Sequence, residues 1–76
     1  MREMIEVIAK ALVDLPEQVR VSETRGEMTS LVELRVARSD VGKVIGEQGR
    51  YADAMRMLLN AASMKLRKKA VLTIIE

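Results

Sequence analysis

Glycine is concentrated in one short stretch of this chain. Three of its four glycines fall within positions 42–49, between two stretches with helical periodicity. Glycine loses more conformational freedom on folding than any other residue, so such a cluster is typical of backbone with positive φ or of a close approach. We therefore predict a tight turn, Gly46-Glu47-Gln48-Gly49, between two helices. The second helix would begin at Arg50, and its first N–H groups and positive dipole end would suit an anion. We predict that this anion is a phosphate of RNA or DNA.

Length and composition narrow the classes of protein to consider. The 76 residues suffice for a single domain, 1–76, and the 49% hydrophobic content favours a compact fold over disorder. The absence of cysteine and histidine excludes disulfide scaffolds, zinc knuckles and Cys/His nucleophiles. No apolar run approaches the roughly 20 residues that a membrane span needs, and charged residues interrupt the N-terminus where a secretory signal would be apolar. We expect a soluble, cytoplasmic protein without metal or cofactor.

The distribution of charge is more informative than the net charge of +2. One segment holds basic residues without an acid: Lys65, Arg67, Lys68 and Lys69. Around the glycines, by contrast, the charges alternate and sum to zero: Asp40, Lys43, Glu47, Arg50, Asp53 and Arg56. The one aromatic residue is Tyr51, which excludes modules that stack bases on aromatic platforms.

The first half of the chain predicts a helix followed by a hairpin. Apolar residues at helical spacing are Met4, Ile5, Ile8, Ala11, Leu12 and Leu15. Pro16 would end this helix, because the residue before a proline avoids the α region. Val19 and Val21 alternate with polar residues, and Leu31–Ala37 forms a second alternating run with Val32, Leu34 and Val36 on one side. We expect an antiparallel hairpin with a turn at Thr24–Glu27, where Gly26 is free to take positive φ.

The second half predicts two helices and a strand. Ser39 or Asp40 can cap a short helix that runs to Ile45. A longer helix, Arg50–Met64, would carry the apolar stripe Ala52, Met55, Leu58, Leu59 and Ala62. Ala70–Ile75 predicts a third strand that is apolar on both faces. The long crossover between the second and third strands permits a parallel pair, and a right-handed crossover places all helices on one face of a three-stranded mixed sheet. The basic segment would then lie at the opposite end from the glycine turn, as a second electrostatic contact or a solvated helix end.

The order αββααβ, with Val44-Ile45-Gly46-x-x-Gly49 at the helix–helix turn, resembles a type II KH domain, an α+β fold whose GXXG loop clamps backbone nucleotides. The run from Gly42 to Arg50, with Ala54, Leu58-Leu59 and Ala61-Ala62, further resembles the KhpA family of small bacterial single-KH-domain proteins. The resemblance covers essentially the whole chain. It implies a cytoplasmic protein that binds single-stranded RNA as an RNA chaperone or post-transcriptional regulator. It also implies a dimer, either with itself or with a larger KH-domain protein.

The resemblance also assigns roles within the turn. Gly46 and Gly49 would admit the RNA backbone, and Lys43 and Arg50 would contact phosphates. One of Val44 and Ile45 would line the groove that receives bases, while the other enters the core. The implied RNA-binding set is Lys43, Val44, Ile45, Gly46, Glu47, Gln48, Gly49 and Arg50, with Arg56 as an additional candidate.

Three residues depart from the family pattern and lower the positive potential at the turn. Glu47 stands where a basic or neutral residue is common, and Asp53 where a cation is frequent. Tyr51 replaces a small polar residue, and it either adds a stacking contact or covers the start of the helix. Because phosphate neutralisation dominates nucleic-acid affinity, we expect weak, salt-sensitive binding.

The sequence also bears on two other classes of function, an enzyme and a protein-interaction module. An enzyme is disfavoured, because the glycines fit neither a phosphate-loop nor a dinucleotide motif and no nucleophile–base pair is evident; we expect no small-molecule substrate. The alternative is a protein-interaction module with a KH fold and weak or no RNA binding. Val71 and Ile75 on the third strand favour it, since apolar residues at a sheet edge are a liability if left bare. Four methionines could add adaptable contact surface: Met1, Met28, Met57 and Met64.

Overall fold

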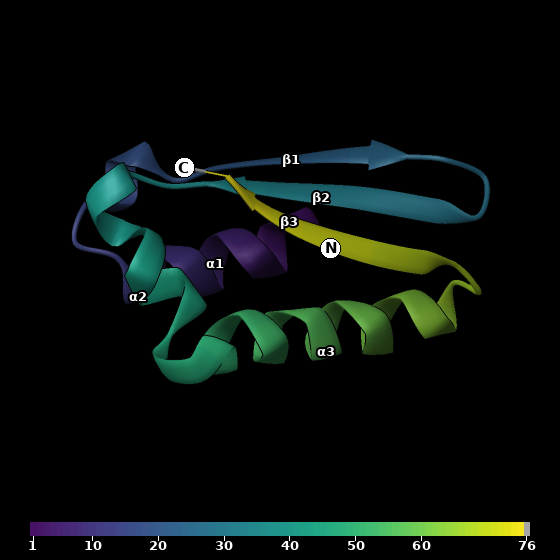
Figure 1. Cartoon of the computed structure of the whole chain (residues 1–76). Helices are drawn as coiled ribbons and strands as arrows, with labels where there is room; N and C mark the ends of the chain where they lie inside the picture. Colours follow the sequence, from purple (N-terminus) through teal and green to yellow (C-terminus); the bar gives the residue numbers. More distant parts are fainter. Residues whose placement is uncertain (76) are drawn as a thin grey trace.

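The computed structural model describes residues 1–75, which form three helices and three strands (Figure 1). Single 3-10 turns at Pro16–Gln18, Arg38–Asp40 and Glu47–Gly49 join them. In chain order the elements are α1 (Arg2–Leu12), β1 (Arg20–Arg25), β2 (Thr29–Arg35), α2 (Val41–Ile45), α3 (Arg50–Lys65) and β3 (Lys69–Ile75). The predicted order αββααβ and the α+β fold of a type II KH domain are confirmed.

The three strands form one mixed sheet with β2 in the centre. β1 pairs antiparallel with β2, with Arg20 opposite Arg35, and β3 pairs parallel with β2, with Arg35 opposite Ile75. All the helices lie on one side of the sheet: α1 contacts β1, α3 contacts β3, and α2 lies at one end (Figure 1). The sheet therefore has one face covered by helices and one face open.

The core lies between the sheet and the helices, and it follows from two periodicities. In β2 alternate residues are buried, namely Ser30, Val32 and Leu34, because successive side chains of a strand point to opposite faces. In α3 the buried residues recur every three or four positions, as a helix of 3.6 residues per turn requires: Ala52, Met55, Leu59 and Ser63. Ile5 and Ala9 of α1 and Val44 of α2 complete the core from the helical side.

The predicted end of the first helix and the predicted helix cap are both wrong, for one physical reason. The Asp40 side chain is buried and makes no capping hydrogen bond at α2, and neither does Ser39. Instead the backbone N–H groups of Asp14 and Leu15 donate to the Asp40 carboxylate, at 3.2 and 3.0 Å. The chain leaves α1 after Leu12, earlier than Pro16 alone would require, and Asp40 binds the segment that follows.

The hairpin turn lies later than predicted. β1 begins at Arg20 and continues to Arg25, which pairs with Ser30, so the turn is reduced to residues 26–28. The Gly26 N–H donates to the Thr29 carbonyl at 2.8 Å. Among the described residues the glycines with positive φ are Gly46 and Gly49, so Gly26 does not adopt the positive φ that it was free to take. The ladder extends to Arg25 and Ser30, and this adds two strand pairs in place of a wider turn.

Candidate nucleic-acid interface

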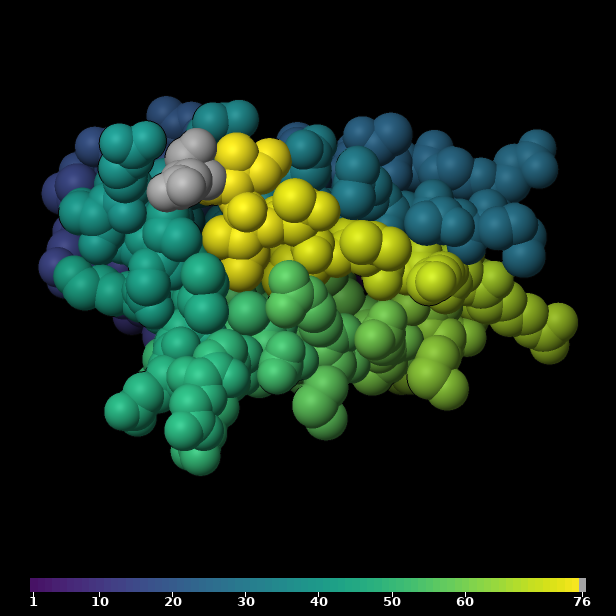
Figure 2. All heavy atoms as spheres, viewed as in Figure 1, coloured from purple at the N-terminus to yellow at the C-terminus, as the bar shows by residue number. Residues whose placement is uncertain are grey.

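The glycine turn has the unusual backbone that its sequence predicts. Gly46 has φ 79° and ψ 173°, and Gly49 has φ 76° and ψ 12°; Gln48 between them also has positive φ, at 57°. The Gly49 N–H donates to the Gly46 carbonyl at 3.1 Å, which closes the turn. The turn protrudes from the lower left of the molecule in Figure 2, so its backbone is accessible from outside.

The two glycines are required for different reasons. A Cβ atom on Gly46 would lie 2.7 Å from Cδ2 of the Tyr51 ring and 3.0 Å from the Tyr51 backbone nitrogen. A Cβ atom on Gly49 would meet nothing within 4 Å. The Tyr51 ring therefore packs against Gly46 of the turn, and it leaves the Gly49 side of the turn open. The Tyr51 side chain is 50% exposed.

The doublet before the turn divides between core and surface, as predicted. Val44 is completely buried among the helices, whereas Ile45 is 36% exposed beside Gly46. Because α2 has only five residues, this one-residue step turns the two side chains by about 100° around the helix axis. Ile45 is thus the apolar side chain of the doublet that can meet a ligand at the turn.

The two predicted phosphate contacts differ in availability. The Lys43 ammonium forms a close ion pair with the Asp14 carboxylate and lies 3.5 Å from Asp40 Oδ1. The hydrogen bond to Asp14 raises the pKa of Lys43, against the opposing effect of its desolvation. Burial would raise the pKa of Asp40, but the N–H groups of Asp14 and Leu15 and the Lys43 ammonium outweigh it and lower that pKa. Arg50, by contrast, is exposed, and residues 1–75 offer it no ion pair.

The remaining groups at the turn are of mixed sign. No side chain in residues 1–75 caps the N-terminus of α3. The first backbone N–H groups of this helix therefore point back toward the turn without a capping partner. Glu47 and Gln48 are exposed at its tip. Asp53 forms an ion pair with Arg56 at 3.7 Å. The charge of Arg56, the additional candidate for RNA binding, is therefore partly neutralised by its neighbour. Backbone donors and Arg50 are therefore the groups best placed to meet an anion.

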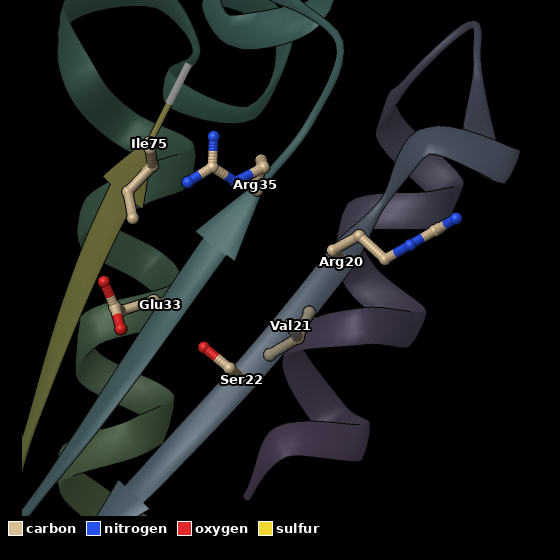
Figure 3. Close-up of a pocket in the computed structure, with 6 residues that line it drawn as sticks. All are labelled: Arg20, Val21, Ser22, Glu33, Arg35 and Ile75. Carbon is tan, nitrogen blue, oxygen red and sulfur yellow. The ribbon is translucent and has the colours of Figure 1, made fainter.

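A pocket of about 330 Å³ lies elsewhere, on the open face of the sheet (Figure 3). Arg20 and Arg35 line the pocket from the neighbouring strands β1 and β2, but their guanidinium groups point in different directions (Figure 3). Arg20 donates to the carbonyls of Glu17 and Val19, at 2.8 and 2.9 Å. The pocket therefore lacks donors that converge on one point, and it contains none of the predicted site residues.

α3 exposes more apolar surface than the sequence indicated. Leu58 was expected in the core stripe, but it is 46% exposed, and Met57 and Met64 are 71% and 75% exposed. The core needs only one of the adjacent residues Leu58 and Leu59, and the spacing from Met55 to Ser63 selects Leu59. On the open sheet face Val71 and its neighbour Leu31 are also partly exposed. No described helix is long and apolar enough to cross a membrane.

Comparison with known proteins agrees with this architecture. The family model described as KhpA/KhpB, KH domain, matches residues 2–74. The RNA-binding protein KhpA of Clostridium perfringens is 52% identical over 75 residues, which cover 99% of this chain and 100% of that protein. The RNA-binding protein KhpA of Aquifex aeolicus is 47% identical over 76 residues, which cover 100% of this chain and 96% of that protein. No solved structure gives a significant match. The chain belongs to the KhpA/KhpB family of KH domains.

Proposed function

We propose that this chain binds single-stranded RNA by clamping the RNA backbone at the glycine turn. The observation that carries the proposal is the open side of Gly49, where positive φ and free space let a phosphate approach the main chain. Full-length relatives that are named RNA-binding proteins support the choice of RNA as ligand. Binding of this kind needs no catalytic group, and it suits an RNA chaperone or post-transcriptional regulator in the bacterial cytoplasm.

Within this proposal the residues of the turn have separate roles. The N–H groups at the start of α3 and the Arg50 guanidinium bind phosphate, and Ile45 contacts a base. Glu47 and Gln48 form the tip and limit the positive potential there. Lys43 contributes only when a phosphate competes with Asp14 for its ammonium group, so Arg50 supplies most of the side-chain charge. The proposed set remains Lys43, Val44, Ile45, Gly46, Glu47, Gln48, Gly49 and Arg50, with Val44 acting from the core.

The test uses two variants at the open glycine. Gly49→Asn and Gly49→Asp add side chains of nearly equal size at a position where both residue types tolerate positive φ. Only the aspartate adds a negative charge that repels phosphate. We expect fluorescence anisotropy with a labelled single-stranded RNA to show a much weaker complex for Gly49→Asp than for Gly49→Asn. Equal affinity of wild type and Gly49→Asp would refute the clamp.

Circular dichroism provides the folding control for this experiment. Because a Cβ atom at Gly49 meets nothing within 4 Å, both variants should retain the wild-type spectrum. Variants at Gly46 are less suitable, since any side chain there collides with Tyr51 and perturbs the fold itself.

A second candidate function is pairing with another copy of this chain or with a larger KH-domain protein. It is favoured by the exposed apolar stripe of α3, in which Met57, Ala61 and Met64 recur at helical spacing beside Leu58. Such a stripe can pack against its own copy, because a two-fold interface uses the same patch on both partners. This surface is more exposed than Val71 on the sheet edge.

Analytical ultracentrifugation separates the two surfaces. Met57→Lys with Met64→Lys should yield monomer if α3 forms the interface, whereas Val71→Lys should then leave the dimer intact. The reverse pattern would assign pairing to the sheet edge. A monomeric wild type at all concentrations would exclude self-pairing.

A further inference from the structure

The chain changes its electrostatic character along α3. Over residues 40–56 acids and bases balance, and the Asp14 carboxylate adds a negative charge beside Lys43. From Ala54 to Ile75 there is no acidic residue at all. This part of the chain ends α3 and begins β3 with four cations, which we call the basic end: Lys65, Arg67, Lys68 and Lys69.

The basic end and the glycine turn lie at opposite ends of the molecule (Figure 1). α3 joins them, and its 16 residues span about 24 Å at roughly 1.5 Å per residue. The basic end projects on the right of Figure 2, while the turn projects at the lower left. One site is therefore nearly neutral and the other strongly positive, and a single helix fixes the distance between them.

Few acids oppose the basic end. The β1–β2 turn lies beside it, since the Lys69 N–H donates to the Met28 carbonyl at 2.8 Å. Glu23 on this hairpin is engaged by Arg25 in an ion pair at 2.8 Å. Glu27 is then the acid of the β1–β2 turn that is left to oppose the four cations of the basic end. Within residues 1–75 none of these four cations forms an ion pair.

At the basic end, Arg67 has a backbone conformation that is unfavourable for any residue except glycine. α3 ends in a Schellman motif, in which the Lys68 N–H donates to the Ser63 carbonyl at 3.0 Å and the Arg67 N–H to the Met64 carbonyl at 3.1 Å. The residue at the position of Arg67 in this motif takes the left-handed conformation, which favours glycine. Arg67 nevertheless occupies it with φ 55°. Strained residues of this kind concentrate at functional sites.

We propose that the basic end is a second RNA-backbone site, so that the bound strand runs from the glycine turn to the basic end and obtains most of its charge-dependent affinity there. The proposal rests on the proposed function, because the glycine turn defines where the strand begins. RNA is favoured over an anionic membrane because α3 links the basic end directly to the clamp and carries no acid after Asp53 that would repel a phosphate backbone.

The distance between the sites sets the length of RNA that the proposal requires. At the duplex spacing of about 3.4 Å per nucleotide, 24 Å corresponds to roughly seven nucleotides, and a more extended single strand covers the same distance with fewer. A KH turn clamps about four nucleotides. A four-nucleotide RNA therefore occupies the clamp alone, and an RNA of about twelve nucleotides reaches both sites.

The experiment measures affinity as a function of RNA length. Labelled oligouridines of four, eight, twelve and sixteen nucleotides are titrated against wild type and against Lys65→Gln with Lys68→Gln. Arg2→Gln with Lys10→Gln is the matched control, because it removes the same charge from α1, which packs against β1 rather than β3. For a single strand, the logarithm of the affinity falls by about 0.7 per phosphate contact for each tenfold rise in salt. Two contacts that contribute nothing at 1 M salt therefore contribute roughly 25-fold at 0.1 M salt, and their loss weakens binding by that factor.

We expect this loss only for Lys65→Gln with Lys68→Gln, and only with the RNAs of twelve and sixteen nucleotides. The affinity of the same variant for the four-nucleotide RNA should equal that of wild type. Equal loss at every length, or equal loss in the control, would overturn the proposal and assign the effect to net charge. Unchanged twelve-nucleotide affinity would also overturn it, and Gly49→Asp would then report separately whether the clamp functions. Wild type that binds phosphatidylserine vesicles but shows no gain from four to twelve nucleotides would assign the basic end to membranes instead.

Arg67 supplies an independent readout. Arg67→Gly should raise the melting temperature, since it relieves the left-handed strain, and should weaken binding of the twelve-nucleotide RNA by about fivefold, the value of one phosphate contact. Arg67→Lys should retain that affinity, because it keeps the charge. A stabilised Arg67→Gly with wild-type affinity would show that this residue has no part in RNA binding.

Discussion

Gly46→Ala tests whether the Tyr51 ring and the glycine turn form one packed unit. The substitution meets two obstacles. The backbone of residue 46, with φ 79° and ψ 173°, lies in a region that is essentially restricted to glycine. Its methyl group would also lie 2.7 and 2.8 Å from two carbon atoms of the Tyr51 ring, and 3.0 Å from a backbone nitrogen that cannot move independently of α3.

The two obstacles can be given magnitudes. The strained backbone costs roughly 1–3 kcal/mol. Overpacking against the ring costs about 1–3 kcal/mol more. Gly49→Ala meets only the left-handed penalty of about 1–2 kcal/mol, because nothing lies within 4 Å of its Cβ atom. We therefore expect Gly46→Ala to lower the free energy of unfolding by about 2–6 kcal/mol, a large share of the roughly 4–11 kcal/mol expected for a chain of this length.

Urea unfolding followed by circular dichroism measures both variants. The decisive comparison adds Tyr51→Ala, which removes the ring and should make Gly46→Ala less costly by the overpacking share, about 1–3 kcal/mol. Gly49→Ala should cost the same with or without the ring. If the two glycine substitutions prove equally destabilising, or if Tyr51→Ala does not reduce the cost at Gly46, the proposed packing of the turn is wrong.

Three further predictions concern the support of the turn. Asp40→Asn should destabilise the protein near neutral pH, since it removes the ionised acceptor of two N–H groups. Because folding lowers the pKa of Asp40, its contribution is present above the unfolded value of about 4 and is lost as pH falls through the folded pKa. Wild type and Asp40→Asn should therefore converge in urea unfolding at low pH; a constant difference would refute this assignment. Leu59→Ala should cost about 2–5 kcal/mol in the same assay and Leu58→Ala much less, because only Leu59 is completely buried. Ser30→Ala should leave the melting temperature unchanged or raise it, since the Ser30 hydroxyl is buried without a hydrogen-bond partner among residues 1–75. A clear decrease in the melting temperature would mean that the hydroxyl does form a stabilising hydrogen bond, and would refute this prediction.

Features set by local periodicity could be predicted from the sequence. The alternation in β2 places Val32 and Leu34 in the core, and the glycine spacing predicts positive φ at Gly46 and Gly49. The division of Val44 and Ile45 between core and surface follows from the same logic. Each of these depends on residues that are close together in the chain, where sterics and one nearby apolar face decide the outcome.

Features set by tertiary contacts could not be predicted in this way. Lys43 was expected to face phosphate, but Asp14, 29 residues away in the sequence, engages it. Asp40 resembles a helix cap in sequence, yet the loop after α1 offers it two N–H groups inside the core. Leu58 and Leu59 are indistinguishable by spacing, and only the position of the sheet determines which one is buried. Nothing near these residues in the sequence carries that information.

The parallel pairing of β2 with β3 has a consequence for the route of folding. β1–β2 pairs join residues five to fifteen positions apart, whereas every β2–β3 pair joins residues 40 apart. Contacts of long sequence separation form slowly, because the chain between them must lose its freedom before they stabilise it. The glycine turn belongs to that intervening chain. The hairpin can thus be in place before β3 pairs with β2, and the helices that flank the glycine turn are held against the sheet only when that last pairing forms.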